Sequence, residues 1–491
     1  MKHKFAYFFI LLSSIIFLND TIQKIQYSPD DTFIYLQYAR NIAAGNGCSF
    51  NAGEPSYGVT SPLWVYFLTV PYYLGYDGFM FSKIFDFCFL ILSVFVFYRL
   101  AHIFWENRKE IALLAVSVFI LNAWIVRWSF TGMETSFAVF LVLTVFYLYY
   151  IGSYKLLFFT LGAFQLVRPE SFVLTAIFFI YILFNNIKYK NFRIKETSLY
   201  IICYFILLMP FLLYAYLKFG TILPNTALGK STLIFSVPTI INQVIEIFKT
   251  LSAAGAIEIF LSAVFIVLFI WRDKDEKYFL PAVWIAGLII LYSVTDSDII
   301  SRYLLIIVPF FILLGFNVFT KIKKLNPALL IIIYLIFVSF SEFIFYNYVK
   351  PHTDNFTKGV NECLIPAGYW LKNNTPPSSK ILVNDVGAIG YYSERYIFDA
   401  AALINNDPEM NRKIINTPLE MRMNTHMLLD IVKADYVIER DSVTAKDIQS
   451  YKNMNFELVY KKEFPGLGIK DDSPKIYKIY KVKYTGELKQ F

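Results

Sequence analysis

The chain carries little charge for its length. Asp, Glu, Lys and Arg make up 17% of its 491 residues, whereas an average soluble domain has about 25%. Long apolar stretches stand in place of the missing charge, and the mean hydropathy is +0.51. The 50 Phe and 36 Tyr residues suit lipid-facing and interfacial positions. This composition excludes an ordinary soluble domain and predicts an integral membrane protein.

Cysteine and histidine are scarce, with four residues of each. No CxxC motif occurs and no Cys and His pair has the spacing of a zinc site, which argues against a structural zinc or a dense disulfide framework. The net charge is +8, but no basic face carries interleaved stacking aromatics, so we expect no nucleic-acid partner. Inverted repeats, which many transporters contain, are also missing.

Apolar stretches of near-spanning length predict a polytopic α-helical membrane protein with about 11 transmembrane helices. Basic residues gather in the connections at 108–109, 188–195, 272–277 and 321–324, which would be cytoplasmic if the N-terminus is cytoplasmic. The basic start and apolar first stretch resemble a signal peptide, but no small-x-small cleavage site follows, so we expect an uncleaved first span. The stretches lie at about 4–19, 80–103, 111–127, 135–151, 156–168, 170–185, 197–217, 251–271, 278–295, 302–320 and 327–346.

Polar segments divide this chain into two expected domains. Residues 1–346 form a transmembrane module that includes a long first outside loop at about 20–79, within which 62–74 is expected to form a helix in the membrane interface. Residues 347–491 form a soluble α/β domain on the non-cytoplasmic side. Short buried-strand patterns are present in this domain at 380–385, 434–439, 456–460 and 475–482.

Two adjacent carboxylates, Asp30 and Asp31, follow the first span. A structural interpretation makes Asp30 the N-cap of an amphipathic helix over 33–43, with Asp31 favourable to the helix dipole. In the functional interpretation, one carboxylate accepts a proton from an acceptor hydroxyl and the other orients a substrate or a cation. The residues alone leave both interpretations open.

Other ionisable residues are expected at the outer ends of the spans. Burying the charges of Glu134, Arg168 and Glu170 at such depths costs free energy. These residues are therefore expected either to line a cavity or to form an ion pair, Arg168 with Glu134 or with Glu170. Arg302 and Lys230 are outward cations that suit a lipid-linked phosphate, although Arg302 also suits an interfacial anchor. These charges fit an enzyme acting on lipid-borne substrates, and they also fit a transporter vestibule.

A set of short motifs runs in order along almost the whole chain. The motifs are Asp30-Asp31-Thr32-Phe33-Ile34, Tyr38-Ala39-Arg40-Asn41, Gly45-Asn46-Gly47, Asn51-Ala52-Gly53-Glu54, Thr60-Ser61-Pro62-Leu63-Trp64, Thr131-Gly132-Met133-Glu134, Arg168-Pro169-Glu170, Leu223-Pro224-Asn225-Thr226, Ser301-Arg302-Tyr303-Leu304, the stretch from Asp385 to Tyr392, Asp399 and Ala434-Asp435-Tyr436-Val437. Their order resembles the GT-C superfamily of membrane glycosyltransferases, and it is most similar to the bacterial branch with terminal arabinofuranosyltransferases and mannosyltransferases. One departure is Pro55-Ser56-Tyr57-Gly58, which lacks an acidic residue near Tyr57.

The resemblance implies inverting transfer of a sugar from a polyprenyl-phosphate donor to a glycan, lipid or protein acceptor. Asp30 or Asp31 would then be the catalytic base, and Arg302, Lys230 and Arg168 would bind the donor phosphate. Substrate-binding or structural roles fall to Glu134, Glu170, Asn225, Arg40 and Trp64. No cofactor is expected, although the paired aspartates leave a divalent cation open.

The implied location is a bacterial cytoplasmic membrane, with the N-terminus inside and membrane lipids as partners. A transporter or flippase for a lipid-linked or polar substrate remains the main alternative. A non-catalytic protein of cell-envelope assembly is the other.

Overall fold

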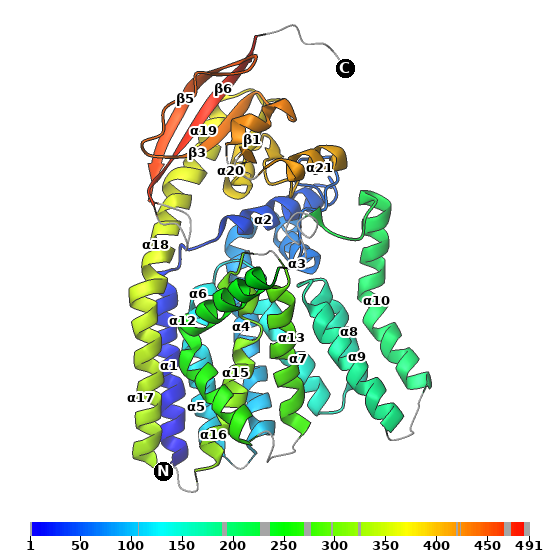
Figure 1. Ribbon diagram of the computed structural model, residues 1–491, viewed down its shortest axis with the longest axis vertical. Helices are drawn as coiled ribbons and strands as arrows, with labels where there is room; N and C mark the ends of the chain where they lie inside the picture. Colours follow the sequence, from blue (N-terminus) through cyan, green and yellow to red (C-terminus); the bar gives the residue numbers. More distant parts are fainter. Residues whose placement is uncertain are drawn as a thin grey trace. The chain divides into compact units, whose positions relative to one another are not determined.

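Figure 1 shows the computed structural model, in which contacts divide the chain into two compact bodies. The helical body comprises Met1–Ile25, Lys83–Leu213 and Ser231–Lys350. The α/β body comprises Gln26–Ser82, Tyr214–Lys230 and Pro351–Phe491, so the first loop belongs with the C-terminal segment. The structure describes residues 2–106, 108–188, 194–225, 236–269, 276–295, 298–322, 326–418, 421–422, 424–465 and 473–485.

Each of the eleven apolar stretches contains a helix, because long runs of Leu, Ile and Phe satisfy their backbone polar groups within a helix and leave apolar side chains for lipid. In Figure 1, α1 and α17 lie side by side, and α8 packs against α9. The helices are α1 (Lys2–Gln23), α4 (Gly78–Phe104), α5 (Lys109–Leu121), α6 (Ala123–Trp128), α7 (Thr135–Tyr150), α8 (Tyr154–Gln165), α9 (Ser171–Lys188), α10 (Ile194–Phe219), α12 (Val237–Phe269), α13 (Phe279–Ser293), α14 (Ser301–Leu304), α15 (Val308–Gly315), α16 (Asn317–Thr320) and α17 (Pro327–Ile344).

Five of the described helices are long and apolar enough to cross a membrane by length and composition. They lie at Gly78–Phe104, Ser171–Lys188, Lys195–Phe219, Val237–Val267 and within Pro327–Asn374. Four shorter apolar helices lie at Tyr7–Gln23, Thr135–Tyr150, Phe279–Ser293 and Val308–Thr320. The helical membrane architecture is therefore confirmed, while the number of spans stays a prediction.

Helix α12 differs from the expected span, because it starts at Val237 instead of near residue 251. The added segment contains Asn242, Gln243, Glu246 and Lys249, so hydropathy alone hides it. At Gly255 the backbone leaves helical geometry (φ −142°, ψ 25°). The kink separates this more polar first part from the apolar second part.

The α/β body contains one six-stranded sheet with strand order β2-β1-β3-β6-β5-β4. Strand β1 pairs in parallel with β2 and β3, and the remaining pairs are antiparallel. All four predicted strands are present, whereas β2 and β4 were not predicted. The strands are β1 (Lys380–Val383), β2 (Tyr396–Asp399), β3 (Tyr436–Ser442), β4 (Ser450–Tyr451), β5 (Met454–Phe464) and β6 (Lys475–Tyr484).

Helices cover this sheet and build the rest of the body. Buried side chains such as Leu382, Ile414, Leu428, Val437 and Tyr480 form its apolar core. The predicted helix after Ser61 is present as α3, with Pro62 in its first turn, where a missing N–H costs nothing. The helical elements are α2 (Asp30–Ala43), α3 (Pro62–Tyr73), α18 (Lys350–Gly359), η3 (Val360–Leu364), α19 (Ile365–Asn374), α20 (Val386–Ser393), α21 (Pro408–Asn416) and η4 (Thr425–Asp430).

The first loop is bound into the α/β body by hydrogen bonds of its side chains. Asn51 exchanges two hydrogen bonds of 2.9 Å with the backbone of Ile397, and so satisfies an edge position of β2. Tyr391 donates to Asp77 (2.9 Å), and the hydroxyls of Tyr72 and Tyr391 lie 2.8 Å apart. Residues 26–82 therefore fold as part of the C-terminal domain.

Within the helical body, Gly162 of α8 allows a close crossing with α10. A Cβ at this position would clash with the backbone carbonyl group of Tyr204. We expect Gly162→Leu to separate the two helices and to destabilise the body by about 1–3 kcal/mol. The thermal unfolding midpoint of the purified protein in detergent should fall by several degrees. An unchanged midpoint would contradict this packing.

Candidate functional site

Asp30 is the first residue of α2, and its carboxylate binds the start of another helix. The N-cap of α2 is Pro29, and no side chain caps that terminus, so the interpretation of Asp30 as the N-cap is wrong. Instead, the Asp30 carboxylate accepts hydrogen bonds from the backbone N–H groups of Gly387 and Ala388, both at 2.8 Å. These are unpaired donors in the first turn of α20, where an anion is stabilised by the helix dipole.

Gly387 is required for this contact. A Cβ at residue 387 would lie 2.7 Å from the carboxyl carbon of Asp30 and would also clash with the Asp30 backbone carbonyl. Only glycine lets the two backbones approach so closely. The glycine at position 387 of the motif that begins at Asp385 is therefore explained by its contact with Asp30.

A second carboxylate, Asp385, lies directly before α20. It accepts hydrogen bonds from the Arg440 guanidinium at 3.2 and 3.3 Å and from the Tyr477 hydroxyl. Burial raises the pKa of Asp385. Burial and the Asp385 charge together raise the pKa of Asp30 to about 7, even though the two N–H groups favour its charged form.

Arg40 and Trp64 have structural contacts inside the α/β body. The Arg40 guanidinium stacks 4.5 Å from the ring centre of Tyr391 and donates to the Tyr391 carbonyl oxygen at 3.1 Å. It also lies 3.9 Å from a Glu394 carboxylate oxygen. Trp64 is fully buried in α3. Both residues therefore support the fold around α2.

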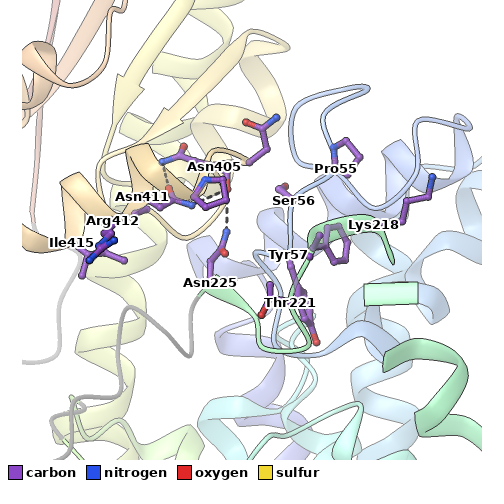
Figure 2. A pocket seen from close by; sticks show the side chains of 15 residues that line it. Pro55, Ser56, Tyr57, Lys218, Thr221, Asn225, Asn405, Asn411, Arg412 and Ile415 are labelled. Atoms are coloured by element: carbon purple, nitrogen blue, oxygen red, sulfur yellow. Dashed lines mark hydrogen bonds between the residues drawn. The ribbon is translucent and has the colours of Figure 1, made fainter. Parts of the chain in front are cut away.

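Asn225 joins two other segments of the α/β body (Figure 2). Its backbone N–H donates to the Tyr57 carbonyl at 2.8 Å, and its side-chain amide donates to the Asn405 carbonyl at 3.0 Å. Lys230, the second phosphate candidate, lies outside the described residues.

In the helical body, Arg168 lies between two glutamates. Its guanidinium is 3.2 Å from Glu134 and 3.8 Å from Glu170, and both Arg168 and Glu134 are at least 95% buried. Glu170 also accepts a hydrogen bond from the Tyr292 hydroxyl. The expected ion pairs with Arg168 are therefore present, and they hold the guanidinium in place.

Arg302 lies among aromatic rings next to this group. Its guanidinium is 5.1 Å from the ring centre of Tyr303 and 5.9 Å from that of Trp128. The Arg168 guanidinium donates to the Arg302 carbonyl at 3.4 Å and lies 5.4 Å from the Tyr303 ring centre. Arg302 and Arg168 thus belong to one buried cluster of the helical body, in which Glu134 and Glu170 offset the positive charge.

Among the described residues, no group of three or more His, Cys, Asp or Glu side chains is arranged to hold a metal ion. For Asp30, one oxygen accepts from Gly387 and the other from Ala388. Both carboxyl oxygens of Asp30 thus bind backbone N–H groups, and cation binding by the paired aspartates stays a prediction.

Comparisons with known proteins show which fold this is. ArnT from Cupriavidus metallidurans bound to undecaprenyl phosphate aligns with a TM-score of 0.60 and 10% identity, over 97% of this chain and 98% of that chain. The Archaeoglobus fulgidus oligosaccharyltransferase in the apo form aligns with a TM-score of 0.61 and 11% identity, over 88% of this chain and 69% of that chain. The chain has the GT-C fold.

Two comparisons at the level of sequence give no function for the chain. A family model described as a domain of unknown function (DUF8728) matches residues 355–480, a segment that lies within the α/β body. No curated protein matches the chain significantly. The GT-C resemblance of the motifs is thus confirmed at the level of the fold by structures that are 10–11% identical to the chain.

Sequence reasoning missed several charged residues in this GT-C fold. Lys83 and Asp86 lie within α4, where Lys83 donates to the Ile25 carbonyl at 2.8 Å and Asp86 accepts from Thr131. Their position within an apolar stretch could have identified them, because ionisable residues are costly there and are usually paired. Asp385 was noted only as part of a motif, because its partner Arg440 is 55 residues away.

The elevated pKa of Asp30 predicts a pH-dependent stability. Between about pH 4 and 7 the folded protein holds a proton on Asp30 that the unfolded chain releases, so stability falls as the pH rises through this window. Asp30→Asn should reduce this slope, and thermal unfolding of both proteins from pH 5 to 7.5 measures it. The exposed Glu362→Gln variant should keep the wild-type slope. Equal slopes for wild type and Asp30→Asn would contradict the assigned proton.

Proposed function

We propose that this chain is a glycosyltransferase that moves a sugar from a polyprenyl-phosphate donor to an acceptor on the non-cytoplasmic side of a cytoplasmic membrane. The observation that carries this proposal is the pair Asp30 and Asp31 at the start of α2 in a chain with the GT-C fold. ArnT was solved with undecaprenyl phosphate, and the archaeal oligosaccharyltransferase AglB with an inhibitory peptide and a dolichol-phosphate. Basic loops on one side of the expected spans support the orientation.

The two aspartates have different proposed roles. Both oxygens of Asp30 accept backbone N–H groups, so Asp30 positions the helix start and Asp31 acts as the base. Asp31 takes the proton of the acceptor hydroxyl while the hydroxyl oxygen attacks the anomeric carbon from the face opposite the phosphate. A bond from that carbon to the acceptor oxygen forms, the bond to the phosphate oxygen breaks, and the anomeric configuration inverts.

The leaving group is a phosphate monoester, which needs charge stabilisation more than a proton. Arg302 is the leading candidate for this role, since its guanidinium is surrounded by aromatic rings where a charge interaction is less screened. Arg168 is the second described candidate for a hydrogen bond to the phosphate, and Glu134 and Glu170 fix its orientation and offset its charge.

A transfer assay with the purified protein tests the base assignment. The donors are polyprenyl-phosphate mannose and polyprenyl-phosphate arabinofuranose, which also distinguish hexosyl from pentosyl transfer. We expect Asp31→Asn to lower kcat by about 100-fold or more, the scale of a lost general base. Asp30→Asn should lower it by about 10-fold, since its amide oxygen still accepts one N–H but the geometry loosens.

Glu362→Gln, an exposed carboxylate of the same body, is the matched control and should retain full turnover. Folding of each variant is checked by its thermal midpoint. Normal turnover in well-folded Asp31→Asn would refute the base assignment. Movement of labelled donor across vesicle membranes without any product would instead favour a transporter.

We further propose that the reaction needs no metal ion. The guanidinium group of Arg302 provides the positive charge that a divalent cation would otherwise supply at the phosphate. Turnover should therefore persist in about 5 mM EDTA, which removes trace divalent metals. A loss of activity that Mg²⁺ or Mn²⁺ restores would contradict this part of the mechanism.

A further inference from the structure

The α/β body contains a cavity of about 410 Å³. Three separate segments form its walls: the loop at 55–57, the segment at 218–225 and the segment at 402–415 (Figure 2). Its volume is within the range of small-molecule binding sites. The proposed chemistry at Asp31 does not use this cavity.

The floor of the cavity is a network of amides with fixed positions. Asn405 donates to the Asn411 side-chain oxygen at 3.1 Å, and Asn411 donates back to the Asn405 carbonyl at 3.1 Å. Asn225 donates to the same carbonyl. Asp399 fixes the loop below by accepting the backbone N–H groups of Ala401 and Leu403 at 2.7 and 2.8 Å. Asn405 is buried, and its amide is fully used within this network, where it also donates to the Asp399 carbonyl and accepts from the Asp399 N–H. The network therefore holds the floor of the cavity in place before a ligand arrives, which lowers the entropy lost on binding.

One wall is aromatic. The ring of Tyr57 stacks on that of Phe219, with ring centres 5.2 Å apart, and both residues line the cavity. An aromatic face next to amide groups suits a ligand that has both apolar C–H faces and many hydroxyls. Sugar rings have this combination.

The charge of the lining has one sign. Lys218 and Arg412 are both exposed residues that line the cavity, and Figure 2 shows them on opposite sides of it. None of the described residues that line it is Asp or Glu. The lining therefore favours an anionic ligand over a neutral one.

We propose that this cavity binds an acidic sugar unit, a carboxylate-bearing residue of an oligosaccharide acceptor. Asn225 and the exposed Asn406 contact its hydroxyls, and Tyr57 contacts its apolar face. Lys218 and Arg412 attract its carboxylate from opposite sides of the cavity. The role of this sugar as part of an acceptor rests on the proposed transfer reaction, whereas its binding can be measured without turnover.

The cavity is connected to the helix that carries the proposed base. Ser56 lines the cavity, and its hydroxyl lies 2.7 Å from that of Tyr38 in α2. Tyr38 is two turns after Asp31, a rise of about 10 Å along the helix. An acceptor held in the cavity would thus present a neighbouring sugar unit, and not the bound unit itself, to Asp31.

Binding to the purified full-length chain in detergent, measured by isothermal titration calorimetry, tests the proposal. The acidic probe is trigalacturonic acid, and maltotriose is its neutral counterpart of equal length. We expect the wild type to bind the acidic probe at least tenfold more tightly. Lys218→Glu and Arg412→Glu should each weaken that binding by about tenfold or more, as expected for a lost charge-assisted contact.

Lys413→Glu is the matched control, because it makes the same kind of charge change on the next residue of α21 without lining the cavity. It should bind as the wild type does. Equal affinity for the two probes, or equal losses in Arg412→Glu and Lys413→Glu, would overturn the proposal. Displacement of the probe by equimolar inorganic phosphate would also overturn it, since the cavity would then select phosphate and not an acidic sugar.

The transfer assay separates this proposal from the proposed function. Selective probe binding in a chain without transferase activity would support the cavity and refute the function. Active transfer with no effect of the charge reversals on probe binding would refute the cavity alone.

Discussion

The α/β body depends on one constraint, the need of the first N–H groups of α20 for hydrogen-bond acceptors. The first N–H groups of a helix have no partner within it, and the helix dipole adds positive potential there. In open α/β sheets this position, beyond the carboxyl end of a strand, commonly binds a ligand anion. Here the chain supplies its own acceptor, because the carboxyl group of Asp30 binds the N–H of Gly387, which is 357 residues away in the sequence.

This contact explains why the two neighbouring aspartates are not equivalent. Asp30 is committed to two N–H groups, and Gly387 has no side chain because Asp30 fills that space. Asp31, the next residue, is held by the same helix start but is not the residue that caps α20. The pair thus divides into Asp30, which binds the start of α20, and Asp31, which is the base of the proposed reaction.

The sequence predicts the parts of the fold that depend on local patterns. Apolar stretches give the helices, and the buried runs at 380–385 and 475–482 give β1 and β6. It does not predict β2, because Tyr396–Asp399 is short and depends on Asn51 for its edge hydrogen bonds. Nor does it predict the first part of α12, because polar residues interrupt the apolar stretch before about residue 251.

The candidate site was predictable only in its residue types. Ionisable groups near expected span ends suggested Arg168, Glu134 and Glu170, and the ion pairs follow from the cost of burying a lone charge. The partner of Asp30, by contrast, is set by tertiary structure, and so is the grouping of Asn225 with Asn405 and Asn411. No local spacing connects residues from three distant segments.

Hydrogen exchange of α20 tests the central constraint most directly. The amides of residues 387 and 388 can be followed by mass spectrometry in wild type, Asp30→Ala and Asp31→Ala. The account predicts that Asp30→Ala loses protection at the start of α20, while Asp31→Ala keeps it. Unchanged protection in Asp30→Ala, or an equal loss in both variants, would contradict the separate roles of the two carboxylates.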